Sequence, residues 1–176
     1  MQHRFPVERP LLLDRVQVTS HALRQAHARL GTALVLLEQV AAVRAKYYKQ
    51  ALLTVRAIGG LAASLHACLF TLDDPASLTV SLRLRLGVLN YYTDKAAIQL
   101  VLVQSCCRRN AVIAGWLHQQ ACTYLDAVLE LNRETLRELS CVAAQLTRAA
   151  SDQEQQASLA GAHETSDLLV PGSRQA

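Results

Sequence analysis

The sequence has few of the residues that interrupt helices. Among 176 residues there are 4 prolines and 7 glycines, and Ala and Leu are the most frequent residues. This composition favours helices, because a sheet protein needs frequent turns. Hydrophobic residues make up 51% of the chain, which is enough to bury a core and excludes a disordered protein. The composition therefore predicts an all-α protein.

The sequence also lacks a disulfide framework and a secretory signal. Its five cysteines are an odd number without close regular spacing: Cys68, Cys106, Cys107, Cys122 and Cys141. Near the N-terminus the apolar run of residues 11–13 is too short for a signal peptide. We expect a reducing compartment, the cytoplasm. Cys106 and Cys107 stand beside two arginines, a setting typical of palmitoylation, although small core residues would give the same pattern.

Long hydrophobic runs are absent as well. Residues 57–72 and 110–125 are free of charged side chains, but each stretch is shorter than the roughly 20 apolar residues of a membrane span. We interpret both as buried core helices.

No motif for catalysis or cofactor binding stands out. A nucleophile elbow is missing, and Gly59 with Gly60 lacks the further residues of a phosphate-binding loop. His118 and Cys122 could share a metal from one helix face, with His66 and Cys68 as remote candidates, but a structural zinc site needs four ligands. The aromatic residues fall inside apolar stripes. We therefore expect no enzyme activity, no cofactor, no metal, no nucleic-acid partner and no small-molecule substrate.

Charge is distributed unevenly along the chain. Residues 20–125 carry 11 Lys/Arg and four acidic residues, whereas residues 126–176 carry four Arg and eight acidic residues. The basic part could face an anionic membrane or an acidic partner, or it could be an ordinary solvated surface.

The apolar pattern divides the chain into three parts. Residues 1–19 contain Pro6 and Pro10 and are expected to form an irregular lead-in. Residues 20–150 are expected to form a helical domain, with one long helix up to residue 73 in which Gly59 and Gly60 mark a bend or a close backbone contact. Residues 151–176 turn to Gln, Ser, Gly and acid, so we expect a disordered tail.

The clearest interruption lies at residues 73–77. Asp74 can cap a helix and Pro75 suits a first helical position, so a new helix should begin there. The sequence leaves open whether this segment is the tip of a hairpin or a kink. Residues 78–86 then alternate apolar and polar side chains, which is the strand period, but the chain offers no partner strand and we expect a helix. Gly87 and Asn90 could interrupt it.

Between residues 48 and 110 the order of features resembles part of a BAR domain, the helical membrane-curvature module of sorting nexins. The resemblance covers about a third of the chain. The residues that carry it are Lys49 to Leu52, Leu61, Ala62, Leu65, Leu72 to Pro75, Leu78, Leu82, Leu86, Tyr92, Asp94, Lys95, Arg108 and Arg109. It implies long kinked helices that pair into a dimer whose basic face meets anionic lipid. The implied contacts with lipid or an acidic partner are Lys46, Lys49, Arg56, Arg83, Arg85, Lys95, Arg108 and Arg109.

These observations favour a non-enzymatic scaffold or adaptor made of long amphipathic helices, packed as a bundle or a coiled-coil-like dimer. Such helices cannot hide this much Leu and Val from one another, and exposed apolar faces mark interfaces. We expect a homodimer or helical protein partners, with an anionic membrane as a further candidate contact in trafficking, in the cytoplasm or at a membrane periphery. The alternative is a soluble helical subunit of a larger complex without lipid contact.

Overall fold

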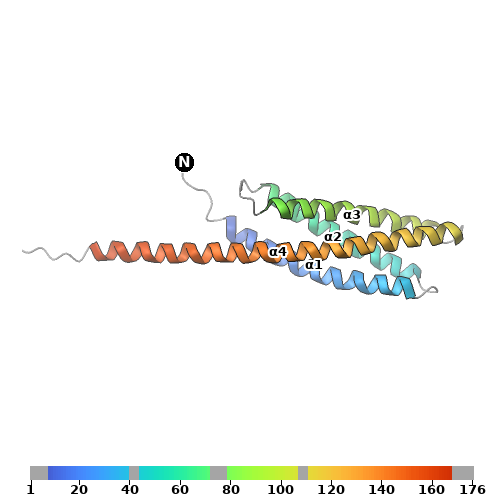
Figure 1. Ribbon diagram of the computed structural model, residues 1–176, viewed down its shortest axis with the longest axis horizontal. Helices are drawn as coiled ribbons and strands as arrows, with labels where there is room; N and C mark the ends of the chain where they lie inside the picture. Colours follow the sequence, from blue (N-terminus) through green and yellow to red (C-terminus); the bar gives the residue numbers. More distant parts are fainter. Residues whose placement is uncertain (1–7, 40–43, 72–78, 107–110, 168–176) are drawn as a thin grey trace, which may run out of the picture.

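In the computed structural model, the described part of the chain forms four helices (Figure 1). The structure describes four stretches of backbone, residues 8–39, 44–71, 79–106 and 111–167. The helices within them are α1 (Glu8–Gln39), α2 (Arg44–Thr71), α3 (Val80–Cys106) and α4 (Ala111–Asp167). No strand occurs in these stretches, and the predicted all-α class is confirmed.

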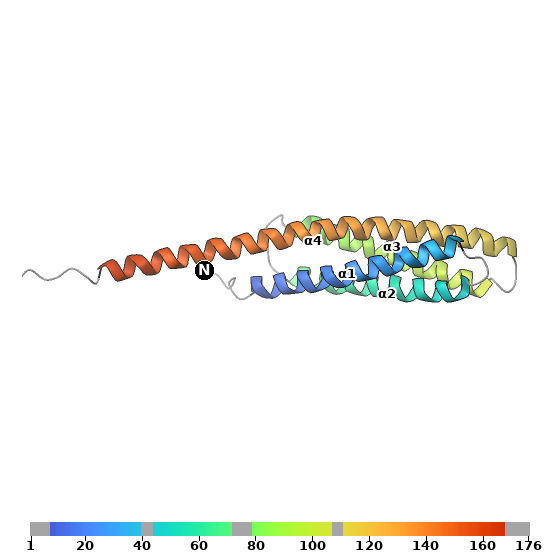
Figure 2. The ribbon, with the colours of Figure 1, turned by 90° about the horizontal axis from the view of Figure 1, so that it is seen from below.

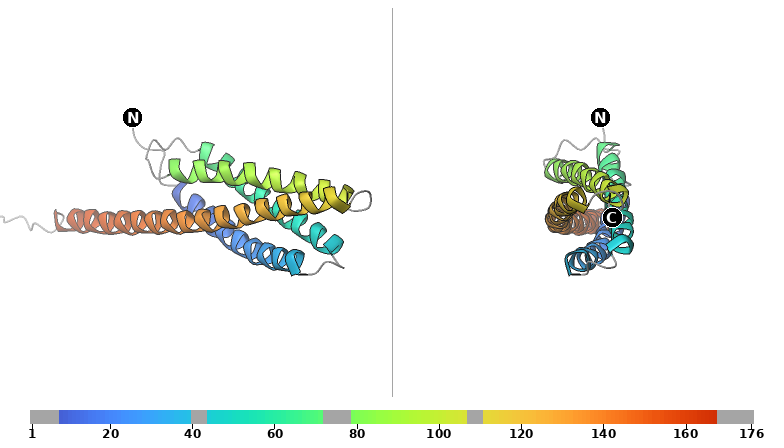
Figure 3. Two further views of the ribbon diagram at one scale, coloured as in Figure 1. Left: turned by 45° about the vertical axis from the view of Figure 1, so that its right-hand side comes forward. Right: turned by 90° about the vertical axis from the view of Figure 1, so that its right-hand side faces the viewer.

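Each helix runs antiparallel to the one before it. Gly59 of α2 lies against Thr93 of α3, and further along α2 the ring of Phe70 lies under Arg83, so residue numbers rise in one helix as they fall in the other. Helix α4 closes the ring by packing against both α3 and α1 (Figure 3). Residues 73–77 fall outside the described residues, but the helices on either side of them form a hairpin in an up-down-up-down bundle.

The core uses residues that repeat every seven positions. In α3 the buried residues are spaced alternately four and three apart: Leu82, Leu86, Leu89, Thr93, Ala96, Leu100 and Val103. The same alternating spacing holds for a series of buried residues in α4: Ala121, Leu125, Val128, Asn132, Thr135, Leu139 and Val142. A repeat of this kind keeps one face of each helix against its neighbours along the whole bundle.

Helix α1 begins earlier than the sequence indicated. Residues 8–19 are helical, so the predicted irregular lead-in is wrong for this segment, while residues 1–7 lie outside the described residues. Pro10 is tolerated because it lies in the first turn, where a backbone N–H would have no partner within the helix. Leu12 and Val16 are buried and extend the core.

The predicted single helix up to residue 73 is also wrong. Helix α1 ends at Gln39 and α2 begins at Arg44, whereas α2 runs without interruption through Gly59 and Gly60. A Cβ atom at Gly59 would lie 2.7 Å from Thr93 Oγ1 of α3. The alternative of a close contact of the backbone is therefore confirmed for Gly59, which lies against the Thr93 side chain.

The alternating run after residue 78 is helical from Val80 onward, as predicted. Leu82 and Leu86 are buried in the bundle, whereas Leu84 between them is 68% exposed. Neither Gly87 nor Asn90 interrupts α3. The strand period arises because α3 is apolar on two opposite faces.

Helix α4 continues to Asp167, beyond the predicted domain boundary at residue 150. Its final part projects past the other helices (Figure 2), and the side chains of residues 151–158 are all exposed. Gln, Glu and Ala are good helix formers, and extending an existing helix requires no new nucleus. Residues 151–167 are therefore helical, and the predicted disordered tail remains a prediction for residues 168–176, which lie outside the described residues.

Candidate interaction surface

Helix α3 carries a second apolar stripe on the side that points away from the bundle. We call it the outer stripe, and it consists of Leu84, Val88, Tyr91, Lys95, Ile98 and Leu102. Its apolar members are all exposed, with Ile98 at 54% and Tyr91 at 57%. The spacing alternates four and three, as in the buried stripe of α3. The two stripes are offset by two residues, about 200° around the helix, so they lie on opposite faces.

An apolar stripe in this position is unusual for the free surface of a single chain. A helix that is apolar on both sides is normally covered on both sides. Single exposed apolar residues need no explanation, but a continuous row of them marks an interaction site. The outer stripe extends from Leu84 to Leu102, so it follows most of the length of α3.

Lys95 is the one charged member of the outer stripe. Its Nζ atom lies 5.2 Å from the centre of the Tyr91 ring, one turn earlier on the same helix. This distance suits a cation–π interaction, in which the aromatic face attracts the ammonium group. The positive charge of Lys95 is therefore already stabilised by an aromatic residue of the same stripe.

The two arginines of α3 point away from the outer stripe. Arg85 Nη1 donates to Glu134 of α4 at 2.6 Å, and Arg85 Nε lies 3.8 Å from Glu138. Arg83 has its guanidinium carbon 5.4 Å from the centre of the Phe70 ring and donates to Thr79 Oγ1. Both side chains thus brace the bundle through partners in this chain.

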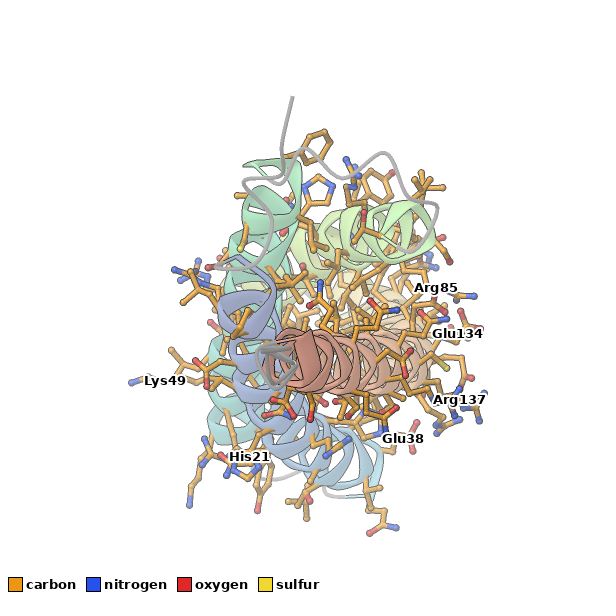
Figure 4. The ribbon with its side chains drawn as sticks, turned by 90° about the vertical axis from the view of Figure 1, so that its left-hand side faces the viewer. His21, Glu38, Lys49, Arg85, Glu134 and Arg137 are labelled. Carbon is orange, nitrogen blue, oxygen red and sulfur yellow. The ribbon has the colours of Figure 1, made fainter. Side chains whose placement is uncertain are left out.

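The predicted lipid or acidic-partner contacts are spread over different sides of the molecule. Lys46, Lys49 and Arg56 are exposed on α2 and share one face of that helix. Lys49 and Arg85 point to opposite sides of the bundle (Figure 4). Arg83 stacks on Phe70, Lys95 belongs to the outer stripe, and Arg108 and Arg109 lie outside the described residues. The described candidates therefore do not gather into one basic face.

Several small residues are exposed on α2, among larger ones such as Leu53: Ala57, Gly60, Ala63, Ser64 and Ala67. A shallow groove of about 170 Å³ separates this part of α2 from α3, with Arg56 and Asp94 among its lining residues. In the described part of the chain, Lys46–Phe70 is the one segment with the length and hydropathy of a membrane span. Its Tyr48, Val55 and Leu69 are buried in the bundle, a pattern that core helices share.

The candidate metal pair lies in a polar contact between α2 and α4. Tyr48 Oη and His118 Nδ1 are 2.7 Å apart, and Cys122 Sγ lies 3.8 Å from the same nitrogen. His66 instead packs against Phe70 near the other end of α2, so the remote candidate does not converge on this pair. Among the described residues no three His, Cys, Asp or Glu side chains gather as a metal site.

A polar seam joins α1 to α4. Asn132 is fully buried and its Nδ2 donates to the carbonyl oxygen of Leu23 at 3.2 Å. His27 lies half-buried in the same seam. Burial, followed by the positive charge of Arg133, lowers the pKa of His27, while Glu130 acts weakly in the opposite direction. The contact between α1 and α4 therefore contains a buried amide and a half-buried imidazole.

The sequence indicated exposed apolar faces in general but did not single out the outer stripe. The signal was the alternating run of residues 78–86, since alternation on a helix places apolar residues on two faces. Leu84 lies opposite the buried face of α3. Comparison with family models, curated proteins and solved structures finds no match for this chain.

Proposed function

We propose that the protein is a non-enzymatic helical scaffold that binds another helix along the outer stripe of α3. The observation that carries this proposal is the heptad spacing of exposed apolar residues from Leu84 to Leu102. This is the spacing with which one helix packs against another. Removing apolar surface from water is favourable by about 25 cal/mol per Å². A second helix that covers the outer stripe would therefore be stabilised along the whole stripe.

The shape of the surface favours a helix over a small ligand. Small molecules bind in concave pockets that enclose most of their surface. The outer stripe is a ridge on a single helix, and the described groove beside it is shallow. Helix-on-helix recognition uses anchors at spacings of three and four, as found here.

A second candidate is peripheral contact with an anionic membrane, as the BAR resemblance implies. Lys46, Lys49 and Arg56 favour it because they share an exposed face of α2. Salt-sensitive sedimentation with phosphatidylserine vesicles would support this candidate, since screening weakens exposed charges. A soluble subunit of a larger complex would leave the vesicles unbound.

The scaffold function is tested in the cells that make the protein. The variant Leu84→Gln, Val88→Gln, Ile98→Gln makes the outer stripe polar at three exposed positions, so the bundle should still fold. We expect the wild-type chain to elute in a species larger than its own 19.3 kDa, and the variant to elute near the monomer mass.

The matched control is Val18→Gln, Val35→Gln, which alters exposed apolar residues on α1. This control should elute as the wild type does. Equal elution of the wild type and the outer-stripe variant would contradict the proposed function. Circular dichroism of the purified variant checks that its helix content is unchanged.

A further inference from the structure

We propose that the partner is a second copy of this chain, whose α3 packs antiparallel against the first α3 along the outer stripe. This inference rests on the proposed function and names its partner. A two-fold axis passes between Tyr91 and Lys95 and relates the two copies. The evidence is the order of the residues within the stripe. When the stripe is laid antiparallel against a second copy of itself, each residue faces one that suits it.

In the antiparallel arrangement every residue of the outer stripe faces a residue of the second copy, and each facing pair forms one layer of the contact. Leu84 meets Leu102 of the second copy, Val88 meets Ile98, and Tyr91 meets Lys95. In the next layer outward, exposed Ser81 of one copy meets exposed Ser105 of the other. Each pair joins two positions of the heptad that face one another in antiparallel coiled coils. Leucine and β-branched side chains therefore lie inside the contact, and small polar residues close its ends.

Lys95 selects this register. A parallel pairing places Lys95 directly against Lys95 of the other copy, where like charges repel. Shifting the antiparallel pairing by one heptad places Lys95 against Leu84 or Ile98, which buries the ammonium group among apolar atoms. The proposed register instead places it on the ring of Tyr91 from the second copy. Within one chain, Nζ already lies 5.2 Å from the centre of a Tyr91 ring, so the residue types suit each other.

The charges near the axis balance. Asp94 is exposed beside Lys95, on the edge of the stripe next to α2. In the two-fold pairing, two Asp94 and two Lys95 side chains come together at the centre of the contact, where the two ammonium groups offset the repulsion between the two carboxylates. Opposite charges at the edge of a helix pair set partner choice and orientation. The centre of the contact thus carries no net charge.

Pairing would require little reorganisation. Helix α3 is already formed and packed against α2 and α4 within the bundle. A preformed helix has no folding cost when it binds, unlike a disordered segment. The layers from Ser81 to Ser105 extend over about 36 Å at 1.5 Å per residue.

Charge exchange across the axis tests the proposal. Purified protein at micromolar concentration is measured by size exclusion with light scattering, and the wild type should have twice the mass of the 19.3 kDa chain. Val88→Glu and Ile98→Lys should each weaken pairing at least about tenfold, because each buries an unpaired charge. The double variant V88E/I98K should regain the dimer, since each new carboxylate faces a new ammonium group of the other copy.

Positions 88 and 98 lie about 15 Å apart along one helix, so the new charges cannot neutralise each other within a chain. Val35→Glu on α1 is the control and should remain dimeric. A monomeric wild type, or a double variant as weak as the single variants, would overturn the self-pairing. If the purified protein is monomeric while the outer-stripe variant still dissociates the cellular species, the scaffold function stands and its partner is a different helix.

Discussion

Polar residues occupy several buried positions in α1 and α4. Asn132 and Thr135 of α4 are fully buried, and Ser20 of α1 is nearly so. Thr135 donates to the carbonyl of Leu131, whereas the Oδ1 atom of Asn132 has no hydrogen-bond partner within the described part of the chain. A buried amide at such a position commonly fixes register at a cost in stability. We interpret Asn132 as the residue that fixes how α1 and α4 align.

His27 in the same seam should make stability depend on pH. Burial and Arg133 lower its pKa below 6.5 in the folded state, with Glu130 in partial opposition. As the pH falls through this value, the unfolded chain binds a proton before the folded chain does, so the free energy of unfolding decreases. We expect the melting temperature to fall between about pH 7.5 and about pH 5, and His27→Gln to reduce this fall.

Thermal unfolding followed by circular dichroism measures both proteins across that range. Other groups also titrate there, so the comparison between wild type and H27Q is the informative quantity. An identical dependence on pH in the two proteins would show that His27 titrates equally in both states.

At the scale of the element, α3 is apolar on two opposite faces. Its inner stripe contributes to the core, and its outer stripe is the proposed contact with another helix. A polar outer face would suffice for a bundle that acts alone. The apolar outer face is therefore the feature of α3 that a function must explain.

The adjacent glycines of α2 should respond oppositely to substitution by alanine. At Gly60 nothing lies within 4 Å of a new Cβ, so Gly60→Ala should stabilise the bundle by about 1 kcal/mol through helix propensity. At Gly59 the new Cβ would lie 2.7 Å from Thr93 Oγ1. That hydroxyl is held by its own bond to the Asn90 carbonyl at 2.7 Å. Gly59→Ala should therefore be destabilising, because overpacking costs about 1–3 kcal/mol.

Urea unfolding of the wild type and the two variants gives the free energies, and each variant is the control for the other. If both substitutions stabilise the protein, α2 and α3 have room to separate at Gly59. In that case the close contact would not be what requires glycine there.

At the scale of the whole molecule, the bundle and the end of α4 are structurally distinct. The four helices share one core, whereas α4 continues beyond it as a single exposed helix (Figures 1 and 2). Its side chains from residue 151 to residue 158 make no buried contact. The stability of the bundle should therefore not depend on this extension.

Ending the chain after Ala150 tests that independence. We expect the melting temperature of the shortened protein to stay within about 2 °C of the full chain, because few buried apolar contacts are removed. Ending the chain after Leu131 is the contrasting variant. It removes buried Asn132, Thr135, Leu139 and Val142 and should unfold the bundle. A large loss of stability on removing residues 151–176 would show that the extension packs against the protein.

The sequence by itself determined the all-α class and most of the core. Composition and the spacing of Leu, Val and Ala are local properties, and a helix converts spacing directly into a face. The helix at residues 80–86 could be predicted in the same way, because no partner strand was available. Boundaries were less predictable, since Pro10 suits the first turn of a helix and α4 continues by propagation alone.

Tertiary structure decided which apolar face became the core. The two stripes of α3 have the same spacing and similar residues, and only packing against α2 and α4 distinguishes Leu82 from Leu84. It also decided that α2 and α3 form a hairpin and that Gly59 lies in close contact with α3. These outcomes depend on which helix faces pack against each other. That packing is determined by residues far apart in the chain.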